Sequence, residues 1–177
     1  ILNLRQKLAS GTGNEKNAIF ADSLVNLYRA ANQYDSAAWF AEESSKFFNT
    51  IEKWIQAGDN YYQAYTLVID QGKQQYFAQK TQEFYTRVLK QGPGNLTVKT
   101  NLAMTYLTSK NPMQGITMLR EVLAQDPKNE LALFNMGMLS IQSGQYDRAI
   151  DRLQELLEVN PAHIQGQLLL GLAYMNS

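Results

Sequence analysis

Two prolines, Pro127 and Pro161, lie 34 residues apart, and the segments that lead into them are similar. Residues 96–129 read LTVKTNLAMTYLTSKNPMQGITMLREVLAQDPKN, and residues 130–163 read ELALFNMGMLSIQSGQYDRAIDRLQELLEVNPAH. A period of this length is typical of stacked helix–turn–helix units, each of which buries its apolar side only against its neighbours. The sequence therefore predicts an all-α fold, a right-handed α-solenoid of helix–turn–helix repeats.

The unit resembles the tetratricopeptide repeat, which has small residues at positions 8 and 20 and a proline at position 32. The matching residues are Ala103, Gly115 and Pro127 in one unit, and Gly137, Ala149 and Pro161 in the next. Small residues let the two helices of a repeat approach closely, and the proline ends the second helix. The resemblance predicts that Gly137 lies where the two helices of its repeat touch.

Continuing the pattern along the chain predicts a single repeat domain over residues 1–177. Its expected parts are the end of an upstream helix and a loop (1–13), repeat 1 (18–50), a lengthened repeat 2 (51–94), repeat 3 (95–129), repeat 4 (130–163) and the first helix of a truncated repeat 5 (164–177). We therefore expect the sequence to be a piece of a longer protein.

The second repeat is expected to be longer than the others. Trp54 and Pro93 are 39 residues apart, about 11 more than the resemblance implies, and 11 residues make three helical turns. The added residues therefore keep the helix faces in register, and we expect unbroken helices over 51–70 and 74–91, each lengthened by about one and a half turns. Gly72 is expected to mark the turn between them.

Charge and composition exclude several kinds of partner. Basic and acidic residues balance at 16 each, so no overall basic field is available for nucleic acid. The longest apolar stretch, residues 168–175, is far shorter than the roughly 18 residues of a membrane span. Cysteine is absent, which fits reducing and oxidising compartments alike. The strings NPMQGI and YDSAA resemble bacterial repeat proteins, many of them membrane-anchored, but the sequence assigns no compartment, cytoplasmic or periplasmic.

No arrangement of residues predicts catalysis, a cofactor or a metal. The single histidine, His163, follows Pro161 at a repeat boundary and is interpreted as a polar residue at a helix start. Two carboxylate pairs, Glu42–Glu43 and Asp151–Glu155, are interpreted as solvated residues of outer, second helices. We therefore expect a protein that is not an enzyme and that presents a binding surface.

The expected surface is the concave groove that first helices line in solenoids of this type. The candidate residues for binding a peptide or protein are Asn101, Met104, Leu107, Phe134, Asn135, Met138 and Ile141. The two asparagines resemble the ladder in the repeats of O-GlcNAc transferase, where amide groups hold the backbone of a peptide. Asparagine also simply suits a solvated groove, and methionines suit varied apolar side chains as well as ordinary packing.

Two functional hypotheses remain open at this point. In the first, the chain is a non-catalytic scaffold that holds a peptide or protein partner in the groove. In the second, it is a structural or self-assembly segment of a longer repeat protein, whose apolar surfaces are covered by further repeats or by another copy. The second hypothesis rests on Leu168, Leu169 and Leu172 of the last helix, which predict contact with another copy or a partner.

Overall fold

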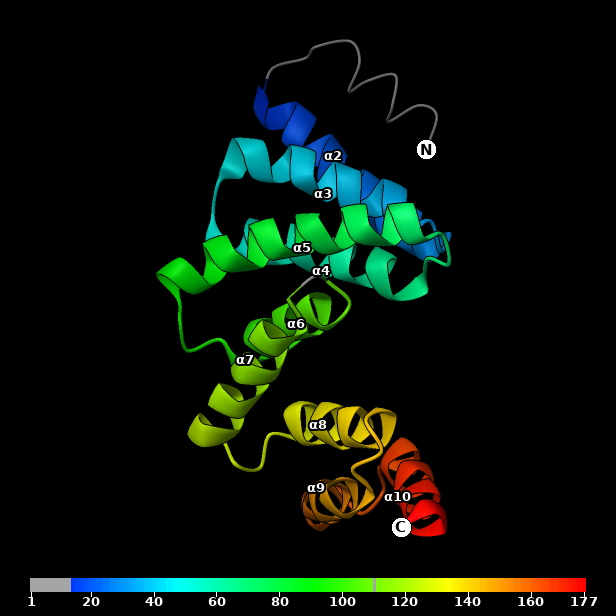
Figure 1. Ribbon diagram of the computed structural model, residues 1–177. Helices are drawn as coiled ribbons and strands as arrows, with labels where there is room; N and C mark the ends of the chain where they lie inside the picture. Colours follow the sequence, from blue (N-terminus) through cyan, green and yellow to red (C-terminus); the bar gives the residue numbers. More distant parts are fainter. Residues whose placement is uncertain (1–13, 110) are drawn as a thin grey trace. The chain divides into compact units, whose positions relative to one another are not determined.

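The computed structural model describes residues 14–109 and 111–177, and this part of the chain is built from α-helices joined by short turns (Figure 1). In chain order the helices are α2 (Asn14–Ala30), α3 (Tyr34–Phe48), α4 (Ile51–Leu67), α5 (Gln71–Gln91), α6 (Leu96–Leu107), α7 (Pro112–Gln125), α8 (Glu130–Gln142), α9 (Tyr146–Val159) and α10 (Ile164–Asn176). The all-α fold of helix–turn–helix repeats is thereby confirmed. The upstream helix expected within residues 1–13 lies outside the described residues.

The chain divides into two compact units, Ile1–Thr105 and Tyr106–Ser177. In the first unit each helix packs on the next, α2 on α3, α3 on α4 and α4 on α5. Aromatic side chains fill much of its core. The ring of Tyr28 stacks on that of Phe40 with centroids 5.4 Å apart, and the ring of Tyr61 stacks on that of Phe84 at 6.0 Å.

Helices α4 and α5 are each unbroken, as predicted, and they are longer than the helices that follow. They have 17 and 21 residues, against 12 to 14 in α6 to α10. The prediction that both helices gain about the same length is wrong, because α5 takes the larger share.

The predicted position of the turn between these helices is also wrong. Gly72 lies inside the first turn of α5, and the turn consists of Val68 to Asp70. The cause is a helix cap, since the side chain of Asp70 accepts a hydrogen bond of 2.7 Å from the backbone N–H of Lys73. This cap satisfies an otherwise free donor and starts the helix at Gln71.

The core of the second unit is formed by α8, α9 and α10. Helix α9 packs on both α8 and α10, and these two helices also contact each other. The fully buried residues of this core are Leu133, Ala149, Leu153, Leu156 and Ala173.

Gly137 lies at the contact between α8 and α9. A Cβ atom at this position would lie 2.8 Å from the Cδ2 and Cγ atoms of Leu153. Real Cβ contacts are longer than this, so the small residue expected at position 8 is needed for the close approach of the two helices.

Candidate functional site

The candidate groove residues of α8 lie partly at the surface of the second unit. Phe134 and Ile141 are half-buried and pack against the core of α8, α9 and α10, while Met138 is also half-buried. The ring of Phe134 lies 5.1 Å from the ring of His163, at the start of α10. Each of these apolar side chains therefore leaves part of its surface in solvent. Leu107, on the last turn of α6, is likewise half-buried.

One of the two candidate asparagines already makes a hydrogen bond within the protein. Asn135 is only 6% exposed, and its Nδ2 atom donates to the carbonyl oxygen of Leu131 at 2.8 Å. Asn101 is half-buried and lies close enough to the Tyr85 hydroxyl to act on its pKa. A primary amide has two N–H donors and one acceptor oxygen, so the side chain of each asparagine can form a further hydrogen bond.

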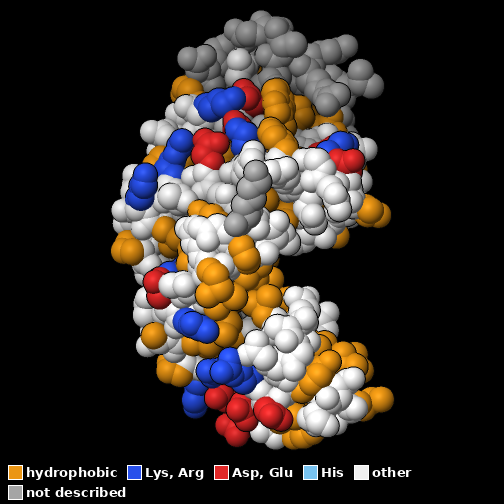
Figure 2. Space-filling model, in the orientation of Figure 1, with side chains coloured by type: hydrophobic (Ala, Val, Ile, Leu, Met, Phe, Trp, Pro, Cys, Tyr) orange, Lys and Arg blue, Asp and Glu red, His pale blue; other side chains and the backbone are white. Residues whose placement is uncertain are grey.

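The last helix exposes a row of apolar side chains. Leu168 and Met175 are 70% and 84% exposed, and Leu172 is also exposed, whereas Leu169 is half-buried against the core. Figure 2 shows hydrophobic side chains at the surface over α10. Helix α10 carries no charged residue.

The 34-residue period relates this row to α8. Leu168, Leu172 and Met175 stand 34 residues after Phe134, Met138 and Ile141, in that order. Helices α8 and α10 are in contact, and these residues stand at equivalent repeat positions on them. We call these six residues the C-terminal apolar face.

Sequence reasoning missed a polar cluster in the first unit. The Tyr85 hydroxyl donates a hydrogen bond of 2.7 Å to Oδ1 of Asp59, and the side chain of Asn101 is close enough to act on the pKa of this hydroxyl. Arg29 is close enough for its charge to act on Asp59. The cluster thus joins residues of α2, α4, α5 and α6. The repeat pattern could place Asp59 and Arg29 on first helices, but the lengthened α5 that delivers Tyr85 has no counterpart in the other repeats.

A second buried network centres on Glu42 of α3. Its carboxylate accepts hydrogen bonds from the Tyr61 hydroxyl at 2.5 Å and from the Lys80 ammonium at 2.9 Å, and its side chain is only 14% exposed. Burial alone would raise the pKa of Glu42, but these two hydrogen bonds and the charge of Lys80 hold the pKa below its ordinary value of 4.5. The interpretation of Glu42 as a solvated residue is therefore wrong, because two neighbouring helices cover its side chain.

The other sequence candidates for chemistry have structural roles. His163 caps α10, since its Nδ1 atom accepts a hydrogen bond of 3.0 Å from the backbone N–H of Gly166. Asp151 and Glu155 are exposed on α9, and Glu155 pairs with Arg152 at 2.7 Å. Within residues 14–109 and 111–177, no group of three or more His, Cys, Asp or Glu is placed to hold a metal ion.

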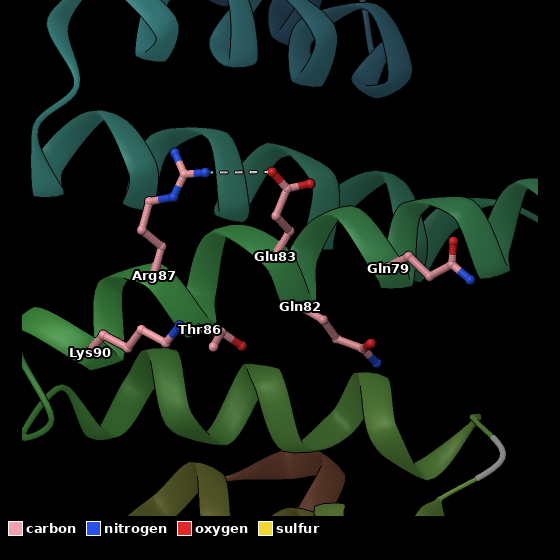
Figure 3. Close-up of a pocket in the computed structure, with 6 residues that line it drawn as sticks. All are labelled: Gln79, Gln82, Glu83, Thr86, Arg87 and Lys90. Atoms are coloured by element: carbon pink, nitrogen blue, oxygen red, sulfur yellow. Dashed lines mark ion pairs between the residues drawn. The ribbon is translucent and has the colours of Figure 1, made fainter.

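One depression on the first unit is lined by residues of α5 alone. They are Gln79, Gln82, Glu83, Thr86, Arg87 and Lys90 (Figure 3). Arg87 Nη2 lies 3.6 Å from Glu83 Oε1, and the Arg87 guanidinium lies 5.3 Å from the ring centroid of Trp54. Because all six residues come from one solvated helix face, the depression does not enclose a ligand. None of the described helices is both long and apolar enough to cross a membrane.

Comparison with known proteins agrees with the repeat pattern. Residues 107–173 match the family model described as tetratricopeptide repeat. This part of the chain is built of tetratricopeptide repeats. One relative in sequence is subunit 3 of the anaphase-promoting complex of Dictyostelium discoideum, 36% identical over 74 residues, which are 41% of this chain and 8% of that protein. The chain thus spans a small part of the length of this relative.

Solved structures similar in fold include those of MamA proteins. A crystal structure of MamA shares 17% of its residues with this chain at a TM-score of 0.65, covering 90% of this chain and 81% of that one. MamA from residue 41 to its end, from Desulfovibrio magneticus RS-1, shares 17% at a TM-score of 0.66, covering 89% and 84%. At this identity the likeness shows the fold. Tetratricopeptide repeats are typically non-catalytic, so the comparisons support a general role as a protein–protein interaction scaffold.

Proposed function

We propose that the C-terminal apolar face, Phe134, Met138, Ile141, Leu168, Leu172 and Met175, binds an apolar segment of a protein partner. The observation that carries the proposal is a set of large apolar side chains, exposed on α10 and half-buried on α8, at repeat-equivalent positions of two helices in contact. Exposed apolar patches of this kind mark interaction surfaces. Methionine at two of the six positions suits partners of varied shape. Asn135 borders this face and could add a hydrogen bond to a partner backbone. Asn101, Met104 and Leu107 of α6 remain separate candidate contacts for a peptide or protein partner.

A library of random peptides displayed on phage tests this function. Peptides selected on the wild-type chain are expected to carry apolar residues at regular spacing. The double variant Met138→Gln, Leu172→Gln should weaken their binding about tenfold or more, because polar side chains replace apolar contacts without changing net charge. Fluorescence anisotropy with a selected peptide measures the change.

The matched control for this experiment is Ala124→Gln on α7, an exposed position outside the face. It should bind the selected peptides as the wild type does. Failure to select any peptide, or equal affinity of the double variant and the wild type, would contradict the proposed site.

A second candidate function is assembly with another copy of the chain through α10. The exposure of Leu168 and Leu172 and the absence of charge on α10 favour it, because an uncharged helix can pack on its own copy without repulsion. Leu169, half-buried beside them, would lie at the edge of such a contact.

Self-assembly predicts a mass larger than that of one chain in sedimentation at high concentration. The double variant Leu168→Glu, Leu172→Glu should then sediment as a monomer, because it introduces like charges on both sides of the contact. A wild-type chain that is monomeric at all concentrations would rule out assembly and leave partner binding as the function of the face.

A further inference from the structure

The carboxylate of Asp59 is held in a fixed position at the surface of the first unit. Asp59 is exposed, whereas Tyr85, which donates a hydrogen bond to its Oδ1 atom at 2.7 Å, is fully buried. Gly58 makes this arrangement possible. A Cβ atom at residue 58 would lie 2.6 Å from the Cδ1 and Cε1 atoms of the Tyr85 ring. The Tyr85 hydroxyl therefore reaches the Asp59 carboxylate only because residue 58, next to Asp59 in the chain, has no side chain.

The surroundings of Tyr85 fix its orientation further. The side chain of Asn101 on α6 is close enough to act on the pKa of the Tyr85 hydroxyl, and the ring of Tyr62 lies 6.4 Å from the ring of Tyr85. Tyr62 is half-buried and belongs to the same helix face as Asp59, since residues three apart are neighbours on a helix. The exposed carboxylate of Asp59 thus lies near the ring of Tyr62, and the buried side chain of Tyr85 contacts both. Sites that are held rigid before binding spend less free energy on ordering when a ligand arrives.

The charge of Asp59 is incompletely compensated. Partial burial of the Asp59 carboxyl raises its pKa above the ordinary value. The hydrogen bond from Tyr85 and the charge of Arg29 act in the opposite direction. Within the described part of the chain, no ion pair joins Arg29 to Asp59, and Tyr85 is the one side chain that donates to it. A carboxylate accepts about four hydrogen bonds, so Asp59 can accept donors from outside the protein.

We propose that Asp59 binds a lysine or arginine side chain of the protein partner, with the ring of Tyr62 beside the bound cation. This inference rests on the proposed function and names a second point of contact, in the other unit of the chain. A carboxylate oriented by a buried hydroxyl attracts a cation, and a neighbouring aromatic ring favours it as well. The C-terminal apolar face carries no such charge, so the two contacts would bind different side chains of one partner.

Titration with small probes tests the proposal independently of any peptide. N-acetylarginine amide is added to 15N-labelled protein, and the backbone amide signals of Asp59, Tyr62 and Asn101 are followed by NMR. Saturable shifts are expected at these residues. N-acetylnorleucine amide, which has a side chain of similar length without charge, and N-acetylglutamate amide should leave them unchanged.

The variant Asp59→Asn separates a binding role from a structural one. Asparagine keeps an oxygen that accepts the hydrogen bond of Tyr85 but removes the charge. The melting temperature should therefore change little, while the apparent affinity for N-acetylarginine amide should fall about tenfold. Equal affinity of variant and wild type would show that Asp59 serves only to anchor Tyr85.

Three other outcomes would overturn the proposal. Absence of saturable shifts would show that no cation binds, and equal shifts with the norleucine probe would show that the contact is apolar. Binding of the glutamate probe would assign the site to the positive charge of Arg29. None of these results bears on the C-terminal apolar face, whose peptide binding is measured separately. The proposed function and this inference can therefore fail independently.

Discussion

Replacing Gly137 by leucine is expected to lower the free energy of unfolding by about 1–3 kcal/mol or more, because the new side chain overpacks the core. The nearest atoms, Cδ2 and Cγ of Leu153, would lie 2.8 Å from the first added carbon. Leu153 is fully buried among the leucines of α9 and cannot move aside without opening the contact with α8. Thermal or urea denaturation of the second unit measures the loss.

The 34-residue period supplies a matched control at Gly171. This glycine occupies the same repeat position on α10, but a Cβ atom there would meet nothing within 4 Å. The change Gly171→Leu should therefore be neutral or stabilise the protein by about 0.5–1 kcal/mol, since glycine is unfavourable within helices. Both substitutions add the same side chain to a first helix. Equal destabilisation by the two would show that helix packing at Gly137 is not the cause.

The fold could be predicted because its determinants are local and repeated. A small residue at one position, a proline at another and apolar residues between them recur every 34 residues, and Gly137 lies at the helix contact that this pattern predicts. The lengthened second repeat could be predicted as well, because three added turns keep the helix faces in register. Its turn was misplaced at Gly72, since a glycine is a weaker signal here than the cap formed by Asp70.

The side-chain networks could not be predicted because they join residues far apart in the sequence. Asp59 and Tyr85 are 26 residues apart, and Glu42 and Lys80 are 38 apart. Both networks involve the longer α5, for which no other repeat gives a template. The repeat pattern places Glu42 on an outer helix, where a carboxylate is normally solvated. The pattern does not reveal that Tyr61 and Lys80 cover the carboxylate of Glu42.

The candidate binding surface stays a prediction, although the structure shows how far each of its residues is covered. Its residues are first-helix positions, and the exposure of Leu168 and Leu172 agrees with the expectation of an unpartnered apolar helix. Asn135, one of its candidate residues, is only 6% exposed and donates a hydrogen bond to the carbonyl oxygen of Leu131. Helical spacing gives the direction in which a residue points, but not how closely the next helix covers it.

The Glu42 network gives the second large effect. The variant Glu42→Gln is expected to lose about 1–3 kcal/mol at pH 7, because it removes the charge that Lys80 and Tyr61 bind in a mostly buried position. The matched control is Glu43→Gln on the same helix. Glu43 pairs with Lys46 at 2.5 Å on a surface where Lys46 is 59% exposed. Pairs of this kind contribute about 0–1 kcal/mol.

The pH dependence of this loss follows from the direction of the pKa shift. The pKa of Glu42 in the folded protein lies below its ordinary value of 4.5, so the folded state binds the proton more weakly than the unfolded chain does. The stabilisation by Glu42 is therefore fully present above pH 4.5 and is lost as the pH falls through the folded-state value. Wild type and Glu42→Gln should differ most near neutral pH, and their unfolding free energies should converge below pH 4.5. A difference that stays constant from pH 7 to pH 3 would mean that the variant acts through packing rather than through the lost charge.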